Sequence, residues 1–96
     1  MPVAIYVVER YLADVDPDGL SALPEKLAAA TAQLRARGTE IRYLDSTFLP
    51  EEEYCFCRFE ASSLHATELA NRIAGVQYSR ISAAVALGPA AAAHPH

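Results

Sequence analysis

The 96-residue chain contains no tryptophan, one methionine, two cysteines and four glycines, and it has no long hydrophobic run. Because a membrane-spanning helix needs about 18 or more consecutive apolar residues, no segment predicts one. The first residues, Met1-Pro2-Val3-Ala4-Ile5, also lack the basic stretch and apolar core of an export signal. We therefore expect a soluble, cytoplasmic protein.

A basic surface is missing as well. The chain has 8 lysines and arginines against 12 aspartates and glutamates, for a formal net charge of −4. Nucleic-acid-binding proteins usually carry a basic stripe that neutralises phosphates, so we expect no DNA or RNA partner. The hydrophobic content of 52% suits a folded protein, and 96 residues suit one domain rather than two.

The two cysteines, Cys55 and Cys57, occupy alternate positions of a predicted strand. Their Cα atoms are then about 6.8 Å apart on one face, which is a poor separation for a disulfide. Packing as small, buried hydrophobic side chains is the expected role. A redox or soft-metal role stays open, although Cys-x-Cys alone lacks the paired ligands of a zinc site.

The predicted elements follow the order strand, helix, strand, strand, helix, strand. Apolar and β-branched runs predict strands at residues 3–11, 41–48, 54–59 and about 78–86. Three-and-four spacing predicts helices from Leu20 to Gly38 and from Ser62 or Ser63 to Gly75. We therefore expect an α+β, ferredoxin-like β-α-β-β-α-β sandwich over residues 1–87. Its four-stranded antiparallel sheet should carry both helices on one face. Residues 88–96 are expected to form a flexible tail.

Strand periodicity divides the sheet side chains between a helix-covered face and an open face. Expected under the helices are Ile5, Val7, Leu44, Phe48, Cys55, Cys57, Phe59, Ile81, Ala83 and Val85. Expected on the open face are Tyr6, Val8, Arg10, Tyr43, Asp45, Thr47, Tyr54, Phe56, Arg58, Arg80 and Ser82. An exposed face with this many aromatic side chains normally marks an interface. We therefore expect a homodimer or higher homo-oligomer in which the open faces stack sheet on sheet.

The same face also suits a small-molecule ligand held between sheet and partner. The residues that we expect to bind the ligand or form the interface are Tyr6, Arg10, Tyr43, Asp45, Tyr54, Phe56, Arg58 and Arg80.

No catalytic signature is present, because the serines lack a recognisable histidine and acid partner and there is no glycine-rich phosphate loop. His65 is expected to be solvated, and His94 and His96 fall in the predicted tail. The alternative is a small enzyme of the dimeric α+β-barrel class, monooxygenase- or isomerase-like, with a pocket over the open face. Acid–base work on a small organic substrate then falls to Tyr6, Tyr43, Arg58 or Asp45, with arginine favouring the phenolate.

Four short motifs resemble those of a known family. They are Val7-Val8-Glu9-Arg10, Glu53-Tyr54-Cys55, Phe59-Glu60-Ala61 and Arg80-Ile81-Ser82. Over about residues 4–87 the chain resembles the nickel-binding-protein-like family of small bacterial ferredoxin-like domains of unknown function. The resemblance implies a dimeric, metal-binding accessory protein rather than an enzyme.

The chain departs from that family at two places. Members often carry a histidine just before the serine of the second strand, where this chain has Asp45 before Ser46. They often carry another in the second helix, where this chain has Ala70 or Asn71. Nickel favours imidazole nitrogen. The resemblance itself implies nickel or another divalent metal as the cofactor, whereas the loss of both histidines counts against that site and leaves Asp45 as the one oxygen ligand.

Overall fold

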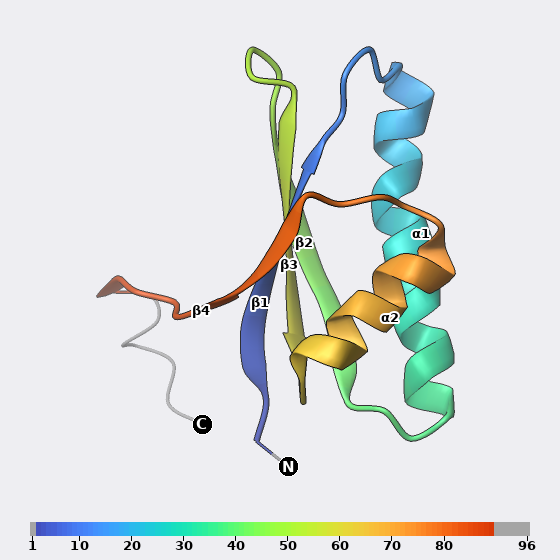
Figure 1. The fold of residues 1–96 in the computed structure, drawn as a ribbon, viewed down its shortest axis with the longest axis vertical. Helices are drawn as coiled ribbons and strands as arrows, with labels where there is room; N and C mark the ends of the chain where they lie inside the picture. Colours follow the sequence, from blue (N-terminus) through green and yellow to red (C-terminus); the bar gives the residue numbers. More distant parts are fainter. Residues whose placement is uncertain (1, 90–96) are drawn as a thin grey trace.

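The computed structural model describes residues 2–89, which form one four-stranded sheet and two helices. The elements are β1 (Ala4–Tyr11), α1 (Pro17–Ala36), β2 (Ile41–Leu49), β3 (Tyr54–Ala61), α2 (Leu64–Ala74) and β4 (Arg80–Ala84). The strand order is β2-β3-β1-β4, and every neighbouring pair is antiparallel. Figure 1 shows both helices on the same side of the sheet. The predicted α+β, ferredoxin-like fold is confirmed.

The predicted tail lies outside the described residues from residue 90 onward, and so do His94 and His96. Neither helix within residues 2–89 has the combination of length and hydrophobicity needed to cross a membrane.

Local capping signals position both helices. The Asp16 carboxylate accepts a hydrogen bond from the Gly19 amide at 2.6 Å, and Pro17 occupies the first turn, so α1 begins three residues before the predicted Leu20. In α2 the Ser63 hydroxyl accepts from the Ala66 amide at 3.0 Å. Gly75 ends that helix with a φ of 72°, a left-handed conformation that glycine adopts without strain.

The hydrophobic core lies between the sheet and the two helices. It is made of Val8, Leu23, Leu27, Leu34, Ile41, Cys55, Cys57, Phe59, Ala61, Ala66 and Ala70. The helical members recur at three-and-four spacing, as predicted, and so lie on one stripe of each helix.

The two faces of β1 are opposite to the predicted ones. Val8 is completely buried, and Tyr6 and Arg10 lie on the same helix-covered side. Ile5 and Val7 instead lie on the open side and are partly exposed. Both sides of β1 are apolar in sequence, so alternation alone did not decide between them. The decision comes from antiparallel pairing, which sets Val8 opposite the buried Cys57.

A β-bulge changes the faces of β2 partway along the strand. The register with β3 shifts between Tyr43 and Asp45, so that Leu44 is the extra residue. Tyr43, predicted on the open face, packs in the core with its ring centroid 5.6 Å from that of Phe59. Leu44, predicted under the helices, does not join the core.

The remaining predictions for the sheet are confirmed at β3 and partly at β4. Cys55, Cys57 and Phe59 are buried under the helices, as expected. Ile81 packs against the same core. Val85, also predicted there, lies beyond the end of β4 and is 81% exposed, because no helix extends over that segment.

Candidate functional site

The open face of the sheet carries an apolar strip with polar flanks. We define this face by the residues that point away from the helices: Ile5, Val7, Glu9, Asp45, Thr47, Tyr54, Phe56, Arg58, Arg80 and Ser82. Tyr54 and Phe56 stack at a tilt, with ring centroids 5.7 Å apart, beside the aliphatic Val7. No helix within residues 2–89 covers this side (Figure 1).

Two ion pairs flank the strip, each joining adjacent strands. The Arg58 guanidinium donates through Nε and Nη2 to the two oxygens of Asp45, at 2.8 and 2.6 Å. On the other side, Arg80 Nε donates to Glu9 Oε2 at 2.7 Å. The hydrogen bonds from Arg58 lower the pKa of the Asp45 carboxyl. The charges on this face are therefore locally neutralised.

The structure separates the eight predicted site residues into two groups. The open face holds Asp45, Tyr54, Phe56, Arg58 and Arg80. The helix-covered side holds Tyr6, Arg10 and Tyr43.

This separation bears directly on the predicted acid–base set of Tyr6, Tyr43 and Arg58. The two tyrosines lie across the sheet from Arg58, so the set is not assembled at one place. Burial raises the pKa of Tyr43, which opposes phenolate formation. The predicted pairing of Arg58 with Tyr6 or Tyr43 is therefore not formed within residues 2–89.

A largely buried group of polar side chains and thiols lies beneath β1, β2 and β3. We call it the thiol cluster; its members are Arg10, Ser46, Cys55, Cys57 and Asn71. The two cysteine sulfurs are 3.8 Å apart, and the Ser46 hydroxyl donates to Cys57 Sγ at 3.0 Å. The signal that was missed is the antiparallel pairing of Arg10 with Cys55.

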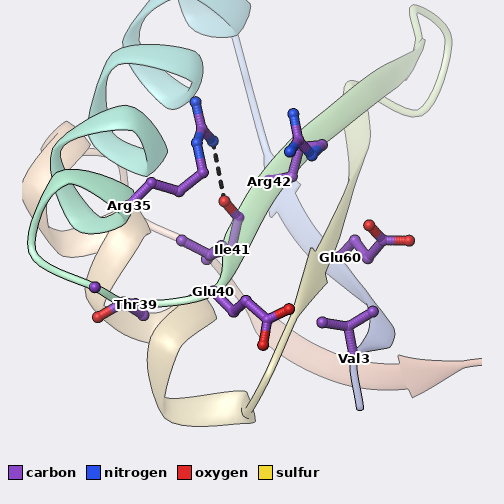
Figure 2. A pocket seen from close by; sticks show the side chains of 8 residues that line it. Val3, Arg35, Thr39, Glu40, Ile41, Arg42 and Glu60 are labelled. Atoms are coloured by element: carbon purple, nitrogen blue, oxygen red, sulfur yellow. Dashed lines mark hydrogen bonds between the residues drawn. The ribbon is translucent and has the colours of Figure 1, made fainter. Parts of the chain in front are cut away.

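A cavity of about 320 Å³ lies at the end of the sheet, where α1 leads into β2. Its walls are formed by Val3, Arg35, Gly38, Thr39, Glu40, Ile41, Arg42 and Glu60. Figure 2 shows the side chains of Arg35 and Arg42 in the upper part of the view, that of Glu60 at the right and that of Glu40 lower down. Because two cationic and two anionic side chains line it, the cavity does not select a ligand of one charge. It also lies away from the Tyr54–Phe56 strip, where the pocket of the predicted enzyme belongs.

The metal-ligating side chains that the structure describes do not group into a nickel site. Among residues 2–89, no three or more histidine, cysteine, aspartate or glutamate side chains group closely enough to hold a metal ion. Both oxygens of Asp45 are engaged by Arg58. His65, exposed on α2, has one carboxylate neighbour, Glu68, at 3.7 Å.

Comparisons with known proteins give one family and one fold match. The family described as nickel responsive protein SCO4226-like matches residues 6–83. The crystal structure of SCO4226 from Streptomyces coelicolor A3(2) is similar with a TM-score of 0.68 and 14% sequence identity, over 88% of this chain and 100% of that chain. At this identity the structural likeness supports the fold alone. No curated protein matches the sequence.

Proposed function

The chain belongs to the SCO4226-like family of nickel responsive proteins, and from this premise we propose that it is a small binding or accessory protein that works as a homo-oligomer. Membership confirms the family resemblance seen in the four short motifs. The observation that carries the proposal is the uncovered aromatic face of the sheet.

A second copy of the chain is the occupant that suits this face best. A two-fold axis brings the same apolar strip from each copy into contact. Phe56 and Val7 of one copy then pack against apolar side chains of the other. The ion pairs of Arg58 and Arg80 already neutralise the charges at the flanks. Little uncompensated charge is therefore desolvated when two such faces meet.

The segment that follows β4 supports the same arrangement. It leaves the sheet on the side away from the helices (Figure 1). Val85 and Leu87 in this segment are 81% and 89% exposed. Exposed apolar side chains at the edge of an apolar face indicate an interface that extends over both, so the segment reaches onto the second copy in the proposed oligomer.

The self-association test compares two lysine substitutions. The Phe56→Lys variant is expected to convert the oligomer to a monomer, because it places an unpaired charge in the centre of the strip. Leu64→Lys is the matched control, since Leu64 is 44% exposed at the start of α2, on the opposite side of the sheet. Size-exclusion chromatography with light scattering measures the mass of each. A monomeric wild-type protein, or equal masses for wild type and Phe56→Lys, contradicts the proposal.

Nickel or another divalent ion is the finer part of the proposal, and it is supported by family membership. Binding through Asp45 requires Arg58 to release the carboxylate, and the other donors must come from outside the described residues or from the second copy. Arg58→Gln is therefore expected to strengthen nickel binding by a factor of up to about five, because exposed ion pairs are worth up to about 1 kcal/mol. Asp45→Asn is expected to weaken it.

Calorimetric titration of nickel into tag-free protein measures both changes. Each variant is measured with and without the His94→Ala and His96→Ala substitutions, which separates the contribution of these two histidines from that of Asp45. If neither Arg58→Gln nor Asp45→Asn alters nickel affinity, Asp45 is not a ligand. The self-association result is unaffected by that outcome.

A further inference from the structure

Arg10 is a buried cation without a carboxylate partner. Its side chain is 1% exposed, and it donates to two neutral acceptors: Asn71 Oδ1 at 2.6 Å and the Gln77 carbonyl at 3.1 Å. Its Nε has no hydrogen-bond partner. Among the ion pairs of residues 2–89, none includes Arg10. Because an uncompensated buried charge is strongly unfavourable, an anion beside Arg10 would stabilise the folded chain.

The two thiols lie on the same helix-covered face of the sheet as this cation. Arg10 on β1 pairs directly with Cys55 on β3, and Cys57 follows two residues later on the same face. The sulfur atoms are 3.8 Å apart, so Cys55 is in reach to donate its S–H to Cys57. Ser46 donates to Cys57 from β2 at 3.0 Å. Side chains from β2 and β3 are therefore in hydrogen-bond reach of the Cys57 sulfur, on the face of the sheet that Arg10 shares.

These neighbours separate the acidities of the two thiols. The hydrogen bond from Cys55, with further help from Arg10 and Ser46, lowers the pKa of Cys57 to about 6, although burial opposes the change. The same hydrogen bond and burial raise the pKa of Cys55. The thiolate is therefore favoured at Cys57 rather than at Cys55. Since the thiolate is the nucleophilic form of cysteine, the two residues have different chemical roles.

We infer that Cys57 and Cys55 form a redox-active thiol pair, in which Cys57 is the nucleophile, Cys55 the resolving thiol, and Arg10 the residue that positions and balances the thiolate. A hydroperoxide is the class of oxidant that suits the site, because both sulfurs are buried and a small molecule is needed to reach them. The pair lies on the opposite side of the sheet from the proposed oligomer interface, so its chemistry is independent of that proposal.

The reaction proceeds in two balanced steps. The Cys57 thiolate attacks the terminal oxygen of the hydroperoxide, an S–O bond forms, the O–O bond breaks, and the departing oxyanion takes a proton from water. Cys57 is now a sulfenic acid. The Cys55 sulfur then attacks the Cys57 sulfur, the S–O bond breaks, and the departing hydroxide leaves with the Cys55 proton as water. Two thiols are oxidised to one disulfide, and one hydroperoxide is reduced to an alcohol or water.

The product is expected to be easily reduced. Residues two apart on one strand lie about 6.8 Å apart, at the upper limit of Cα separations that a disulfide spans, so the bridge carries strain. Forming it also removes the anion beside Arg10. Strained disulfides are the labile ones, so the pair responds reversibly to oxidant.

The test uses the whole chain, in which these are the only two cysteines. After treatment with hydrogen peroxide and an acid quench, mass spectrometry of wild type is expected to show loss of two hydrogens within one chain, restored by a thiol reductant. Cys55→Ser keeps a hydroxyl donor beside Cys57 and is expected to gain oxygen at Cys57. Cys57→Ser is the matched control. Its remaining thiol should react at least about tenfold more slowly, since an ordinary cysteine is only a few per cent thiolate at neutral pH.

Three results would overturn the inference. Equal oxidation rates for Cys55→Ser and Cys57→Ser would remove the assigned roles, and wild type that gains oxygen without forming a disulfide would remove the resolving role. Rates that rise in proportion to the unfolded fraction as urea is added would show that only the unfolded chain reacts. Arg10→Lys, which keeps the cation, should retain most of the wild-type rate, and a folded Arg10→Met should lose it.

Discussion

The Val8→Lys substitution is expected to prevent folding, whereas Val7→Lys is expected to leave the fold intact and weaken self-association. Val8 is completely buried opposite Cys57, while the adjacent Val7 lies on the open face opposite Arg58. An unpaired buried charge costs several kcal/mol, and small domains have only about 5–15 kcal/mol of stability. The same chemical change therefore has opposite consequences at neighbouring positions.

Urea unfolding followed by circular dichroism measures the difference. Because a variant that does not fold has no measurable free energy of unfolding, alanine substitutions supply the numbers. Val8→Ala is expected to lose about 2 kcal/mol as a core truncation, and Val7→Ala less than about 1 kcal/mol. If Val7→Lys unfolds the protein and Val8→Lys does not, the two faces of β1 are reversed.

The second large effect is expected at Arg10. Arg10→Met should lower the free energy of unfolding by about 3 kcal/mol above neutral pH, near the lower end of the range for breaking a buried charge pair. The variant leaves Asn71 Oδ1 and the Gln77 carbonyl without their donor, and the Cys57 thiolate without its cation. Arg80→Met is the control. Arg80 is exposed and pairs with Glu9 at the surface, so its loss should change stability by less than about 1 kcal/mol.

The effect at Arg10 should depend on pH in a defined direction. The pKa of Cys57 in the folded chain is lowered to about 6, below the ordinary value for cysteine. The thiolate therefore contributes stability above the ordinary cysteine pKa of about 8.5, and that contribution is lost as the pH falls towards 6. The pKa of Cys55 is raised, so its protonated thiol contributes to the stability of the fold at low pH. That contribution is lost when the pH rises above the ordinary cysteine pKa.

A double-mutant cycle with Arg10→Met and Cys57→Ser isolates the charge interaction. The coupling free energy is expected to be about 1–3 kcal/mol at a pH near 8 and to decrease as the pH falls below 6. A coupling that does not change with pH would mean that Cys57 is a neutral thiol. In that case Arg10 would stabilise the fold through its hydrogen bonds alone.

The order and type of the elements were predictable from local patterns. Apolar residues at three-and-four spacing placed both helices, and the capping signals at Ser62 or Ser63 and at Gly75 gave the limits of α2, with Ser63 as the cap in the structure. The predicted start of α1 at Leu20 was three residues late, because Asp16 and Pro17 form the helix cap and first turn. Such signals act between residues close in sequence, so the sequence alone determines them.

The faces of the strands depended on information that a single strand does not contain. On β3 the prediction was correct, with the charged Arg58 on the open face and Phe59 buried. On β1 both faces are apolar, so its orientation depends on the pairing with β3. The bulge at Leu44 is likewise visible only when β2 and β3 are aligned. The wrong faces for β1 and β2 also changed the predicted site. Tyr6, Arg10 and Tyr43 were placed on the open face, although they lie on the helix-covered side.

The sequence by itself therefore determined the secondary structure, its order and the presence of an aromatic surface. The tertiary structure alone decided that Arg10 lies buried beside two thiols, while Val7 joins the exposed strip. The physical reason is the range of the interactions: capping and helical periodicity act within a few residues, whereas the direction of a strand's side chains is set by partners far away in sequence.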